Sequence, residues 1–563
     1  MPRNKCLSDE NIRALLADDD DDGILEEVDD ISDEEFVLHE RELQDDEEIS
    51  SSDEDSQAES LEISEGSGSN CFTSPSGDKW FINAPPNTGR MPAHNVLTSR
   101  PGITAYAASR ITEDPASAFE LIFDNDMMET ILTETNRQGG KVIKEWKTIS
   151  VDELKAYIGL CILRGVFKSK HQAVRQLWDP LYGPPIFNQT MALRRFEEIR
   201  RVLRFDNPMT RQARSIRDKL AAVRLLIDGF ISNSQRCYQH SECVTVDEQL
   251  YSFKGRCRYI QYMPSKPAKF GLKYWVLSEA KTYYVSNIEM YCGKDPTRSE
   301  DLGMHVVLKL SDHIKNTGRN ITCDNFFTSL KLARELKKQK NSLVGTIRTN
   351  RREVPKEFRV TKGKPLYDTQ CAYSEDGAVL ISYKAKKNKN VVLLSTQHNE
   401  NRINEGNEKK KSEIVLYYNS TKGGVDCVDE RVSCYSVKYI SKRWHVNVFC
   451  NILDLSCFNT FVLYTSVFPT FEEKKSHKRR IFLSNLGMSL SQKYRDARKI
   501  ITPAKEIPST PVQNREEGQK KRGRCSLCDR KKDKRTANRC SNCKSFVCSE
   551  HLVNLCSQCY DSN

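Results

Sequence analysis

Three aspartates occupy positions from which their carboxylates could meet at one site. Asp247 ends the apolar run VTVD and Asp324 ends the run ITCD, so both are expected at the ends of β-strands. Asp426 could join them from a helix that crosses the same edge of the sheet. Such a cluster supplies the hard oxygen ligands that Mg²⁺ or Mn²⁺ prefers. Taken singly, each aspartate is more typical of a helix cap or a turn, and composition gives no reason to combine them.

A fourth aspartate, Asp429, follows Asp426 within the stretch TKGGVDCVDE, residues 421–430. A spacing of three is one helical turn, so both carboxylates could face the same way. A solvated helix has this pattern, and so does a helix that supplies a metal site. The stretch alone does not distinguish the two.

The C-terminal region has the spacing of a zinc-binding module. Eight soft ligands form four pairs, each with two intervening residues: Cys525 and Cys528, Cys540 and Cys543, Cys548 and His551, Cys556 and Cys559. Eight ligands make two tetrahedral Zn²⁺ sites, whereas disulfides would be unexpected because the other cysteines are scattered like reduced intracellular thiols. Short segments favour a cross-brace, with Cys525, Cys528, Cys548 and His551 at one site and Cys540, Cys543, Cys556 and Cys559 at the other. Folding of so small a module is expected to depend on metal.

Basic and aromatic residues alternate after Asp247. The basic residues are Lys254, Arg256, Lys266 and Lys269, and the aromatic ones are Tyr251, Phe253, Tyr259 and Tyr262. This interleaving suits phosphate contacts combined with base stacking. The alternative is an exposed face of a strand pair.

Charge is distributed very unevenly along the 563 residues. Residues 1–70 contain 26 acidic and 4 basic residues, a net charge of −22, so the remainder must carry +32 to give the overall +10. A basic body of this size favours a polyanionic partner, most often nucleic acid. We also hypothesise that the acidic segment restrains non-specific DNA binding by neutralising the body, and its SSDEDS string (51–56) is a weak signal for an acid-directed kinase.

Periodicity predicts how the elements that position these residues are arranged. Apolar spacing of three and four predicts helices at 152–166 and 217–233. Strand-like runs alternate with helical runs between 243 and 348, which implies an α/β layer with at least partly parallel pairing. The helical pattern returns at about 424 and continues to about 500.

The run 446–468 is the nearest approach to a membrane span. Asn447, Asn451 and Asp454 interrupt it along one helical stripe, which favours a buried core helix over one that faces lipid. The N-terminus lacks a signal-peptide pattern. We therefore expect a soluble intracellular protein, located in the nucleus, with no membrane partner.

Four motifs, in order and with family spacing, resemble the piggyBac family of cut-and-paste DNA transposases. They are TVDEQLYSFKGRCRYIQYMPSKPAKFGLKYW, ITCDNFFTSLKLARELKK, VGTIRTNRREVP and YYNSTKGGVDCVDE. With the cysteine cluster, the resemblance covers residues 95–560. It implies a multidomain α/β protein with an RNase H-like catalytic core, whose Asp247, Asp324 and Asp426 form the triad that holds two Mg²⁺ or Mn²⁺ ions. The family's further essential aspartate corresponds to Asp429.

The resemblance also implies the chemistry and the partners. Water attacks at each transposon end, the freed 3′-hydroxyl forms a hairpin, the hairpin opens, and the ends join TTAA target DNA, so excision leaves no scar. A homodimer would act on double-stranded DNA that carries terminal inverted repeats. Arg348, Arg351 and Lys269 match basic positions linked to DNA. Trp444 matches a tryptophan near the active site, although a core tryptophan at the start of a helix is an equal alternative.

The expected organisation has eight segments. They are a disordered acidic region (1–94), a helical dimerisation and DNA-binding domain split between 95–242 and 436–501, an RNase H-like core split between 243–349 and 413–435, a β-rich insertion (350–412), a basic linker (502–524) and the cysteine-rich zinc domain (525–560). KKRGR (520–524) and RKKDKR (530–535) favour DNA binding by the zinc domain and match the family's nuclear localisation signal, which nuclear import machinery would bind. The rival interpretations are a domesticated DNA-binding protein without transposition, and a chromatin or ubiquitin adaptor built on the zinc module.

Overall fold

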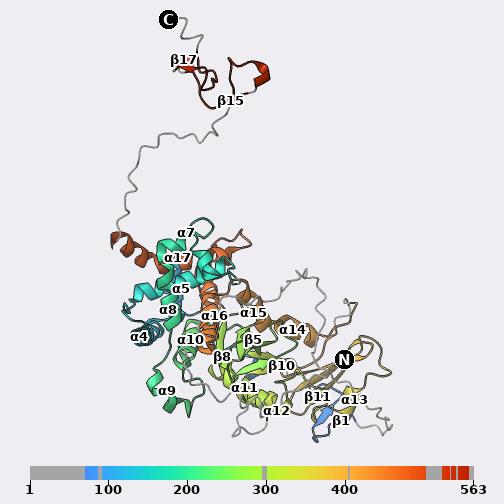
Figure 1. Ribbon diagram of the computed structural model, residues 1–563. Coiled ribbons are helices and arrows are strands. Elements are labelled where there is room, and N and C mark those ends of the chain that lie inside the picture. Colours follow the sequence, from blue (N-terminus) through green and yellow to red (C-terminus); the bar gives the residue numbers. More distant parts are fainter. Residues whose placement is uncertain are drawn as a thin grey trace, which may run out of the picture. The chain divides into compact units, whose positions relative to one another are not determined.

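The structure is a computed structural model that describes residues 70–501 and 523–556, apart from gaps at 87–91, 171, 294–300, 404–405, 407, 533, 541–542 and 554. The chain divides into two compact units, Met1–Asp496 and Ala497–Asn563 (Figure 1). The acidic segment before residue 70, its kinase motif and most of the predicted basic linker lie outside the described residues.

Five strands form the centre of the large sheet in the first unit. They are β5 (Cys243–Ser252), β7 (Phe270–Glu279), β8 (Val285–Met290), β9 (Asn320–Cys323) and β10 (Ser342–Thr346). β9 lies between β5 and β10 and pairs with both in parallel, whereas β7 and then β8 continue the sheet antiparallel on the other side of β5. The short β6 (Ile260–Tyr262) also pairs with β7. The predicted α/β layer with parallel pairing is therefore present.

Strands of the predicted insertion continue the same sheet beyond β10. β13 (Lys389–Ser395) pairs antiparallel with β10, and β12 (Val379–Lys386) and β11 (Thr369–Ser374) follow in order. The predicted β-rich segment thus lengthens the central sheet through one shared strand pair.

A hairpin from the N-terminal region closes this end of the sheet. β1 (Cys71–Thr73) pairs with β2 (Lys79–Phe81), and β2 pairs with β11. Trp80 is buried, and its indole Nε1 donates to the carbonyl of Glu353 at 3.1 Å. The prediction of disorder for residues 1–94 is therefore wrong for 70–86, because one large aromatic side chain gives this polar segment a core to join.

Helices cover both faces of the sheet. Their bounds are α2 (Ala105–Ala108), α3 (Pro115–Ile122), α4 (Asn125–Val142), α5 (Val151–Val166), α6 (Val174–Leu177), α7 (Pro185–Thr190), α8 (Leu193–Val202), α9 (Pro208–Ser215), α10 (Arg224–Cys237), α11 (Leu302–Leu310), α12 (Leu330–Lys338), α13 (Lys356–Arg359), α14 (Glu413–Thr421), α15 (Gly424–Cys434), α16 (Trp444–Val467) and α17 (Lys478–Ile501). Short 3₁₀ turns occur at Ala93–Asn95 and Asp312–Ile314, and the two-residue β3 (Gly102–Ile103) pairs with β4 (Tyr238–Gln239).

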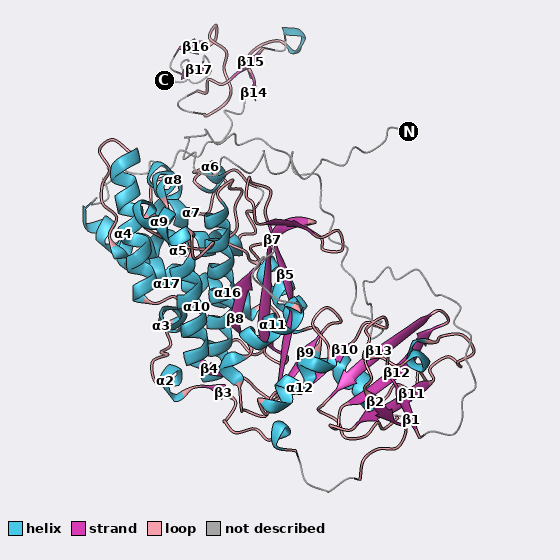
Figure 2. Cartoon of the chain, turned by 90° about the horizontal axis from the view of Figure 1, so that it is seen from below, coloured by secondary structure: helices cyan, strands magenta, loops and turns pink. Residues whose placement is uncertain are grey.

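The largest core lies between the helical region and one face of β5, β7 and β8. Tyr274 and Val276 of β7 pack there with residues of α3, α5, α10, α15 and α16, and Figure 2 shows α10 and α16 beside the three strands. On the opposite face, Val244 and Val246 of β5 pack with α11 and α12. β5 is thus buried on both faces, which explains its long apolar start.

The predicted helices differ from the observed ones mainly at their ends. α5 begins at Val151 because Ser150 caps it, with its Oγ accepting from the Glu153 backbone N–H at 3.1 Å. The predicted helix at 217–233 begins only at Arg224. α16 is apolar and long enough to span a membrane by composition, but 94% of its most apolar window is buried inside the protein, which confirms the expectation of a core helix.

The second unit contains short elements around the cysteine cluster. They are β14 (Gly523–Arg524), a 3₁₀ turn (Arg530–Lys532), β15 (Arg535–Thr536), β16 (Leu552–Val553) and β17 (Leu555–Cys556). β14 pairs with β15 and β16 with β17, both antiparallel. Cys525, Cys540, Val547 and Cys548 form its small buried cluster, so cysteine thiols supply most of this unit's described interior.

Candidate active site

β5 presents alternate side chains to α14, α15 and α16. Thr245, Gln249 and Tyr251 all bond to residues on that side, and strand alternation places Asp247 on the same face. The expectation that Asp247 ends its strand is wrong, because β7 pairs with β5 along its whole length to Ser252. What ends beside Asp247 is β9, whose last residue, Cys323, is opposite Val246.

This register brings Asp324 next to Asp247. Asp324 directly follows β9, and its Oδ1 accepts from the Phe326 backbone N–H at 3.0 Å. Carboxylate oxygens of Asp247, Glu248 and Asp324 all lie within 4.8 Å of one another. The two strand aspartates are therefore brought together as expected, with Glu248 as a third carboxylate that sequence reasoning missed.

Burial and mutual repulsion perturb these acids strongly. Burial, followed by the charges of Glu248, Asp324 and Asp426, raises the pKa of Asp247 well above its ordinary value. Burial and Glu248 raise the pKa of Asp324 to about 6, although backbone N–H groups and Arg348 act in the opposite direction. Like charges held this close in a poorly solvated place favour a bound cation, and oxygen donors of this kind fit Mg²⁺ or Mn²⁺.

Asp426 lies in the first turn of α15 and outside this three-carboxylate group. Its side chain is 67% exposed, and its Oδ1 lies 3.6 Å from Lys266 Nζ. Lys266 also donates to the Glu248 carbonyl at 3.1 Å. Burial lowers the pKa of Lys266, but Asp247, Asp426, Glu248 and Asp429 together raise it above its ordinary value. Lys266 is thus a fixed positive charge among the acids.

Asp429 lies one turn further along α15 and bonds to β5. Its Oδ1 accepts from Gln249 Nε2 at 2.6 Å. Burial raises the pKa of Asp429 to about 7, against the opposing effects of Gln249 and Lys266. The expectation that Asp426 and Asp429 share one face of a helix holds in part, since both influence Lys266 while only Asp429 contacts Gln249.

Comparison with known proteins places this arrangement in a family. Residues 114–461 match the family model described as Transposase IS4. A chain from the cryo-EM structure of a piggyBac transposase synaptic complex with hairpin DNA is 30% identical, with a TM-score of 0.68, and the match covers 82% of this chain and 100% of that one. This chain belongs to the piggyBac family of transposases. The resemblance inferred from four sequence motifs is thereby confirmed.

Two human relatives match part of this piggyBac-family chain. PiggyBac transposable element-derived protein 2 is 26% identical over 382 residues, which cover 62% of this chain and 61% of that protein. PiggyBac transposable element-derived protein 3 is 23% identical over 387 residues, 65% of this chain and 63% of that protein. The chain thus spans about three fifths of the length of these relatives.

The basic residues predicted to bind DNA lie in different settings. Lys254, Arg256 and Lys269 are exposed, whereas Lys266, Arg348 and Arg351 are half-buried. Lys266 and Arg348 act directly on the acids, as their effects on the pKa values of Asp247 and Asp324 show. The structure thus places Lys266 and Arg348 beside the acidic cluster. DNA binding by the other four basic residues stays a prediction.

The aromatic residues interleaved with them are mostly core. Tyr251, Phe253 and Tyr259 are buried in the helix-facing core, so the prediction that they stack on bases is wrong. Only Tyr262 is exposed, with its ring 4.7 Å from that of Phe270. Tyr251 lies on β5, which is buried on both faces, and Phe253 and Tyr259 lie beyond the end of this strand in the same core.

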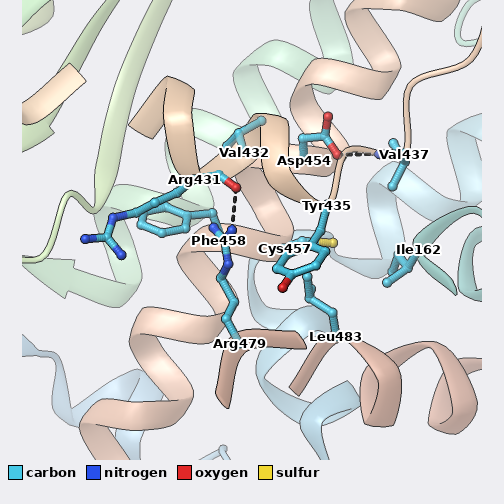
Figure 3. A pocket seen from close by; sticks show the side chains of 10 residues that line it. All are labelled: Ile162, Arg431, Val432, Tyr435, Val437, Asp454, Cys457, Phe458, Arg479 and Leu483. Atoms are coloured by element: carbon cyan, nitrogen blue, oxygen red, sulfur yellow. Dashed lines mark hydrogen bonds between the residues drawn. The ribbon is translucent and has the colours of Figure 1, made fainter. Parts of the chain in front are cut away.

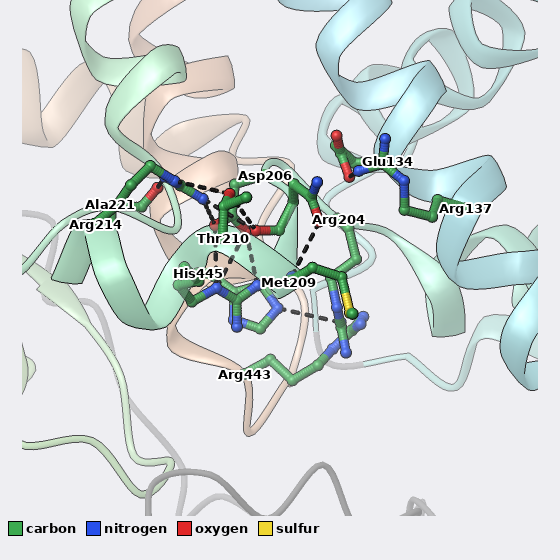
Figure 4. Close-up of polar contacts among 12 residues, drawn as sticks. Glu134, Arg137, Arg204, Asp206, Met209, Thr210, Arg214, Ala221, Arg443 and His445 are labelled. Atoms are coloured by element: carbon green, nitrogen blue, oxygen red, sulfur yellow. Dashed lines mark hydrogen bonds and ion pairs between the residues drawn. The ribbon is translucent and has the colours of Figure 1, made fainter.

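Trp444 is the first residue of α16 and packs edge to face against Tyr259, with ring centroids 5.3 Å apart. Its two neighbours in sequence, Arg443 and His445, both contact the segment 201–204. Arg443 Nη1 donates to the Arg201 carbonyl at 2.9 Å, and Arg204 lies 3.4 Å from His445 (Figure 4). Nearby, the buried Asp206 is paired with Arg211 and Arg214 at 2.7 and 2.6 Å. Trp444 itself is half-buried, and its contact with DNA stays a prediction.

In the second unit, Cys525, Cys528, Cys548 and His551 come together. Their ligand atoms all lie within 4.8 Å of one another. These four are the residues expected for one site of the cross-brace. Of the other four, Cys540 is buried and Cys543 exposed, whereas Cys559 and the side chain of Cys556 lie outside the described part of the chain.

One further polar residue beside the acids, Gln249, escaped sequence reasoning. Gln249 is the second residue after Asp247, so the period of a strand could have placed both on one face. Asn451 Nδ2 donates to Gln249 Oε1 at 2.9 Å. Asn451 belongs to the polar stripe noted in the run 446–468, and this stripe faces β5.

Proposed function

We propose that this chain is a DNA transposase that catalyses metal-dependent cut-and-paste transposition. The single observation that carries the proposal is the cluster of Asp247, Glu248 and Asp324, placed next to Asp426 and Lys266 in a chain of the piggyBac family. Strand cleavage and strand transfer are both phosphodiester exchanges, so one such centre could serve each step.

The central strands support an RNase H-like core. Their order, β8–β7–β5–β9–β10, places Asp247 on β5 beside Asp324, which directly follows the adjacent parallel strand β9. α15 lies against β5 and carries Asp426 toward the same place. We infer that Asp247, Asp324 and Asp426 would hold the divalent cations, with Glu248 adding negative charge.

Divalent cations bound there would lower the pKa of an attacking water or 3′-hydroxyl and stabilise the leaving oxygen. The chain's own residues hold the site ready for them. Backbone N–H groups fix the Asp324 and Asp247 carboxylates, and Lys266 offsets part of the acidic charge before DNA arrives. Arg348, close enough to lower the pKa of Asp324, is placed to contact a phosphate near the reacting bond.

The proposed partner is double-stranded DNA, bound as transposon ends and as TTAA target. The similar solved structure is a synaptic complex with hairpin DNA, which supports hairpin formation, hairpin opening and assembly with DNA in this chain. The basic body outside residues 1–70, with its charge of +32, suits a polyanion. We infer action as a homodimer in the nucleus.

We further propose that the C-terminal unit binds two Zn²⁺ ions and contacts transposon-end DNA. The juxtaposition of Cys525, Cys528, Cys548 and His551 supports the first site. Elemental analysis of the purified chain is expected to find two zinc ions, and one after Cys528→Ser or Cys543→Ser. A chain that purifies without zinc would contradict this part of the proposal.

The experiment that tests the main proposal uses a plasmid whose transposon carries this element's own terminal repeats, flanked by TTAA. Wild type, Asp247→Asn and Asp426→Asn are compared with Mg²⁺ and without it. Hairpinned ends that require both wild type and Mg²⁺ are the expected result. If wild type binds the ends and never cuts them, the chain is a captured DNA-binding protein, an alternative favoured by the names of its human relatives as element-derived proteins.

A further inference from the structure

α15 is held beside β5 at three points, one in its middle and one just beyond each of its ends. Before its start, Thr245 Oγ1 donates to the Thr421 carbonyl at 2.6 Å. In its middle, Gln249 donates to Asp429. After its end, Asp454 of α16 accepts from Ser436 Oγ at 2.5 Å, from the Val437 backbone N–H at 2.8 Å and from Tyr251 OH at 2.8 Å. Figure 3 shows the Asp454–Val437 bond beside Val432 and Tyr435.

The middle point is the one that reaches an acid of the site. Asn451 Nδ2 donates to Gln249 Oε1 at 2.9 Å, and Gln249 Nε2 donates to Asp429 Oδ1 at 2.6 Å. When Asp429 is ionised it can only accept hydrogen bonds, so Gln249 then presents its NH₂ group to Asp429 and its oxygen to Asn451. The Asn451 donor and the Asp429 acceptor thus both fit one orientation of the Gln249 amide, with its NH₂ group toward α15.

This pair of buried amide hydrogen bonds is less favourable than apolar packing would be. Asn451 is 0% exposed and Gln249 is 1% exposed, and burying amides costs free energy that apolar side chains of similar size would not cost. What the two amides achieve is directional. They hold Asp429, and with it the turn of α15 that carries Asp426, at one rotation relative to Asp247.

We propose that Gln249 and Asn451 are positioning residues for strand cleavage, which act through Asp429 to set the orientation of α15. The inference rests on the proposed function for its catalytic consequence. Asp429 acts here as the acceptor at the end of the chain from Asn451, and Asp426 gains its approach to Asp247 from that bond.

Asn451→Asp tests the proposal without changing side-chain size. Burial raises the pKa of a carboxyl group, so the variant is measured at about pH 8.5, where the new side chain is ionised and can only accept. The Gln249 NH₂ group is then drawn toward α16, and its bond to Asp429 is lost. Asn459→Asp is the matched control. Asn459 is also on α16 and fully buried, but its amide bonds to the backbone of Val285 in β8, at 2.6 and 2.9 Å, and to Ser234.

Two measurements separate a positioning role from general destabilisation. Hydrogen exchange of residues 424–434 needs neither DNA nor metal, and it is expected to quicken about 10- to 100-fold in Asn451→Asp, the range for losing a hydrogen bond to a charged group. Cleavage is expected to slow by a similar factor while affinity for the transposon end stays unchanged. In Asn459→Asp, both quantities should remain within about threefold of wild type even if the melting temperature falls equally.

Reversing the chain of hydrogen bonds provides the rescue. In the double variant Asn451→Asp with Asp429→Asn, the turned Gln249 donates to the new carboxylate on α16 and accepts from the new amide on α15. Protection of α15 should then return toward the wild-type value. If Asn451→Asp does not fold, Gln249→Met is measured in its place against Asn459→Asp. This variant directly removes the Gln249 NH₂ group that donates to Asp429.

The outcomes distinguish this inference from the proposed function. Wild type that never cleaves would sink the proposed function, whereas exchange in α15 would still decide whether Asn451 orients the helix. If wild type cleaves, but Asn451→Asp matches Asn459→Asp in exchange and cleavage, or the reversed pair restores nothing, the inference alone is overturned.

Discussion

Glu248 joins the carboxylate cluster although no sequence motif indicated it. It directly follows Asp247, and adjacent strand residues normally point to opposite faces. A carboxylate oxygen of Glu248 nevertheless lies within 4.8 Å of those of Asp247 and Asp324, at the place where β9 ends with Cys323 opposite Val246. Lys273, at 3.9 Å, is its partner on the neighbouring strand.

Glu248→Gln should weaken metal binding more than it weakens chemistry. Removing one negative charge lowers the attraction for a divalent cation, so the Mg²⁺ concentration for half-maximal cleavage is expected to rise about 3- to 10-fold with little change in the maximal rate. Titration of cleavage with Mg²⁺ measures this. Glu289→Gln is the control. Glu289 lies on β8, and its carboxylate pairs with Lys309 at 2.9 Å. Equal Mg²⁺ requirements in both variants would place Glu248 outside the site.

At the scale of elements, the site depends on how closely α15 approaches β5. Gly424 lies where a Cβ atom would be 2.5 Å from Thr245 Oγ1 and 2.9 Å from Ser278 Oγ. Gly423, its neighbour, has only Cys427 Sγ nearby, at 4.0 Å. Of the two glycines in TKGG, one sets the helix–strand distance and the other does not.

Gly424→Ala is expected to push α15 away from β5. The contact cannot be relieved without moving the helix, so stability should fall by about 1–3 kcal/mol. Cleavage should fall by about 10-fold or more, since small displacements of catalytic groups are costly. Gly423→Ala should have little effect on either. Thermal unfolding and single-turnover cleavage of both variants check this, and equal behaviour of the pair would refute the close-approach argument.

Asp454 links α16 to the end of α15 and makes stability depend on pH. Burial raises its pKa to about 7, although Ser436, the Val437 N–H, Tyr251 and Lys438 act in the opposite direction. The folded chain therefore keeps this proton between about pH 4 and 7 while the unfolded chain loses it, so the free energy of unfolding falls as pH rises through that window.

Asp454→Asn removes this titration without changing side-chain size. Wild type should lose stability relative to the variant between pH 5 and pH 8, by on the order of 3 kcal/mol. Unfolding of both proteins at the two pH values measures the difference. Parallel pH profiles would show that Asp454 stays ionised throughout.

Much of this element-level organisation was predictable from sequence, and the exceptions have physical causes. The helical period placed α5 nearly correctly, and the strand-like and helical runs predicted between 243 and 348 correspond to the strands and helices from β5 to β10. The polar stripe of α16 was visible, but its partners were not. Nothing local tells that Asn451 meets Gln249, since that pairing depends on how a helix 202 positions away along the chain packs on β5.

At the scale of the whole molecule, the N-terminal hairpin marks where the acidic segment ends and the folded sheet begins. Residues 70–86 belong to the sheet through β2 and Trp80. Arg334 also joins this hairpin to the rest of the sheet, with Asp78 at 3.0 Å. Composition alone could not separate this short folded segment from the strongly acidic residues before it.

Two truncations test this boundary. Removal of residues 1–69 takes away a net charge of −22 and should tighten non-specific DNA binding at low salt without lowering the melting temperature. Removal of residues 1–86 also takes away Trp80 and should destabilise the chain by about 3–5 kcal/mol. Binding and thermal unfolding of both forms are compared. Unchanged binding after the shorter truncation would refute self-neutralisation, and equal stability would refute the role of the hairpin.

The most direct test of the catalytic centre is single-turnover cleavage by Asp324→Asn. The substrate is a labelled duplex that joins the element's terminal repeat to TTAA, in Mg²⁺, with DNA affinity measured on the same preparations. Removing one ligand of a site that stabilises developing charge should slow cleavage by about 10³-fold or more while binding is retained. An Asp324→Asn protein that cuts at the wild-type rate would contradict the assignment of the carboxylate cluster as the active site.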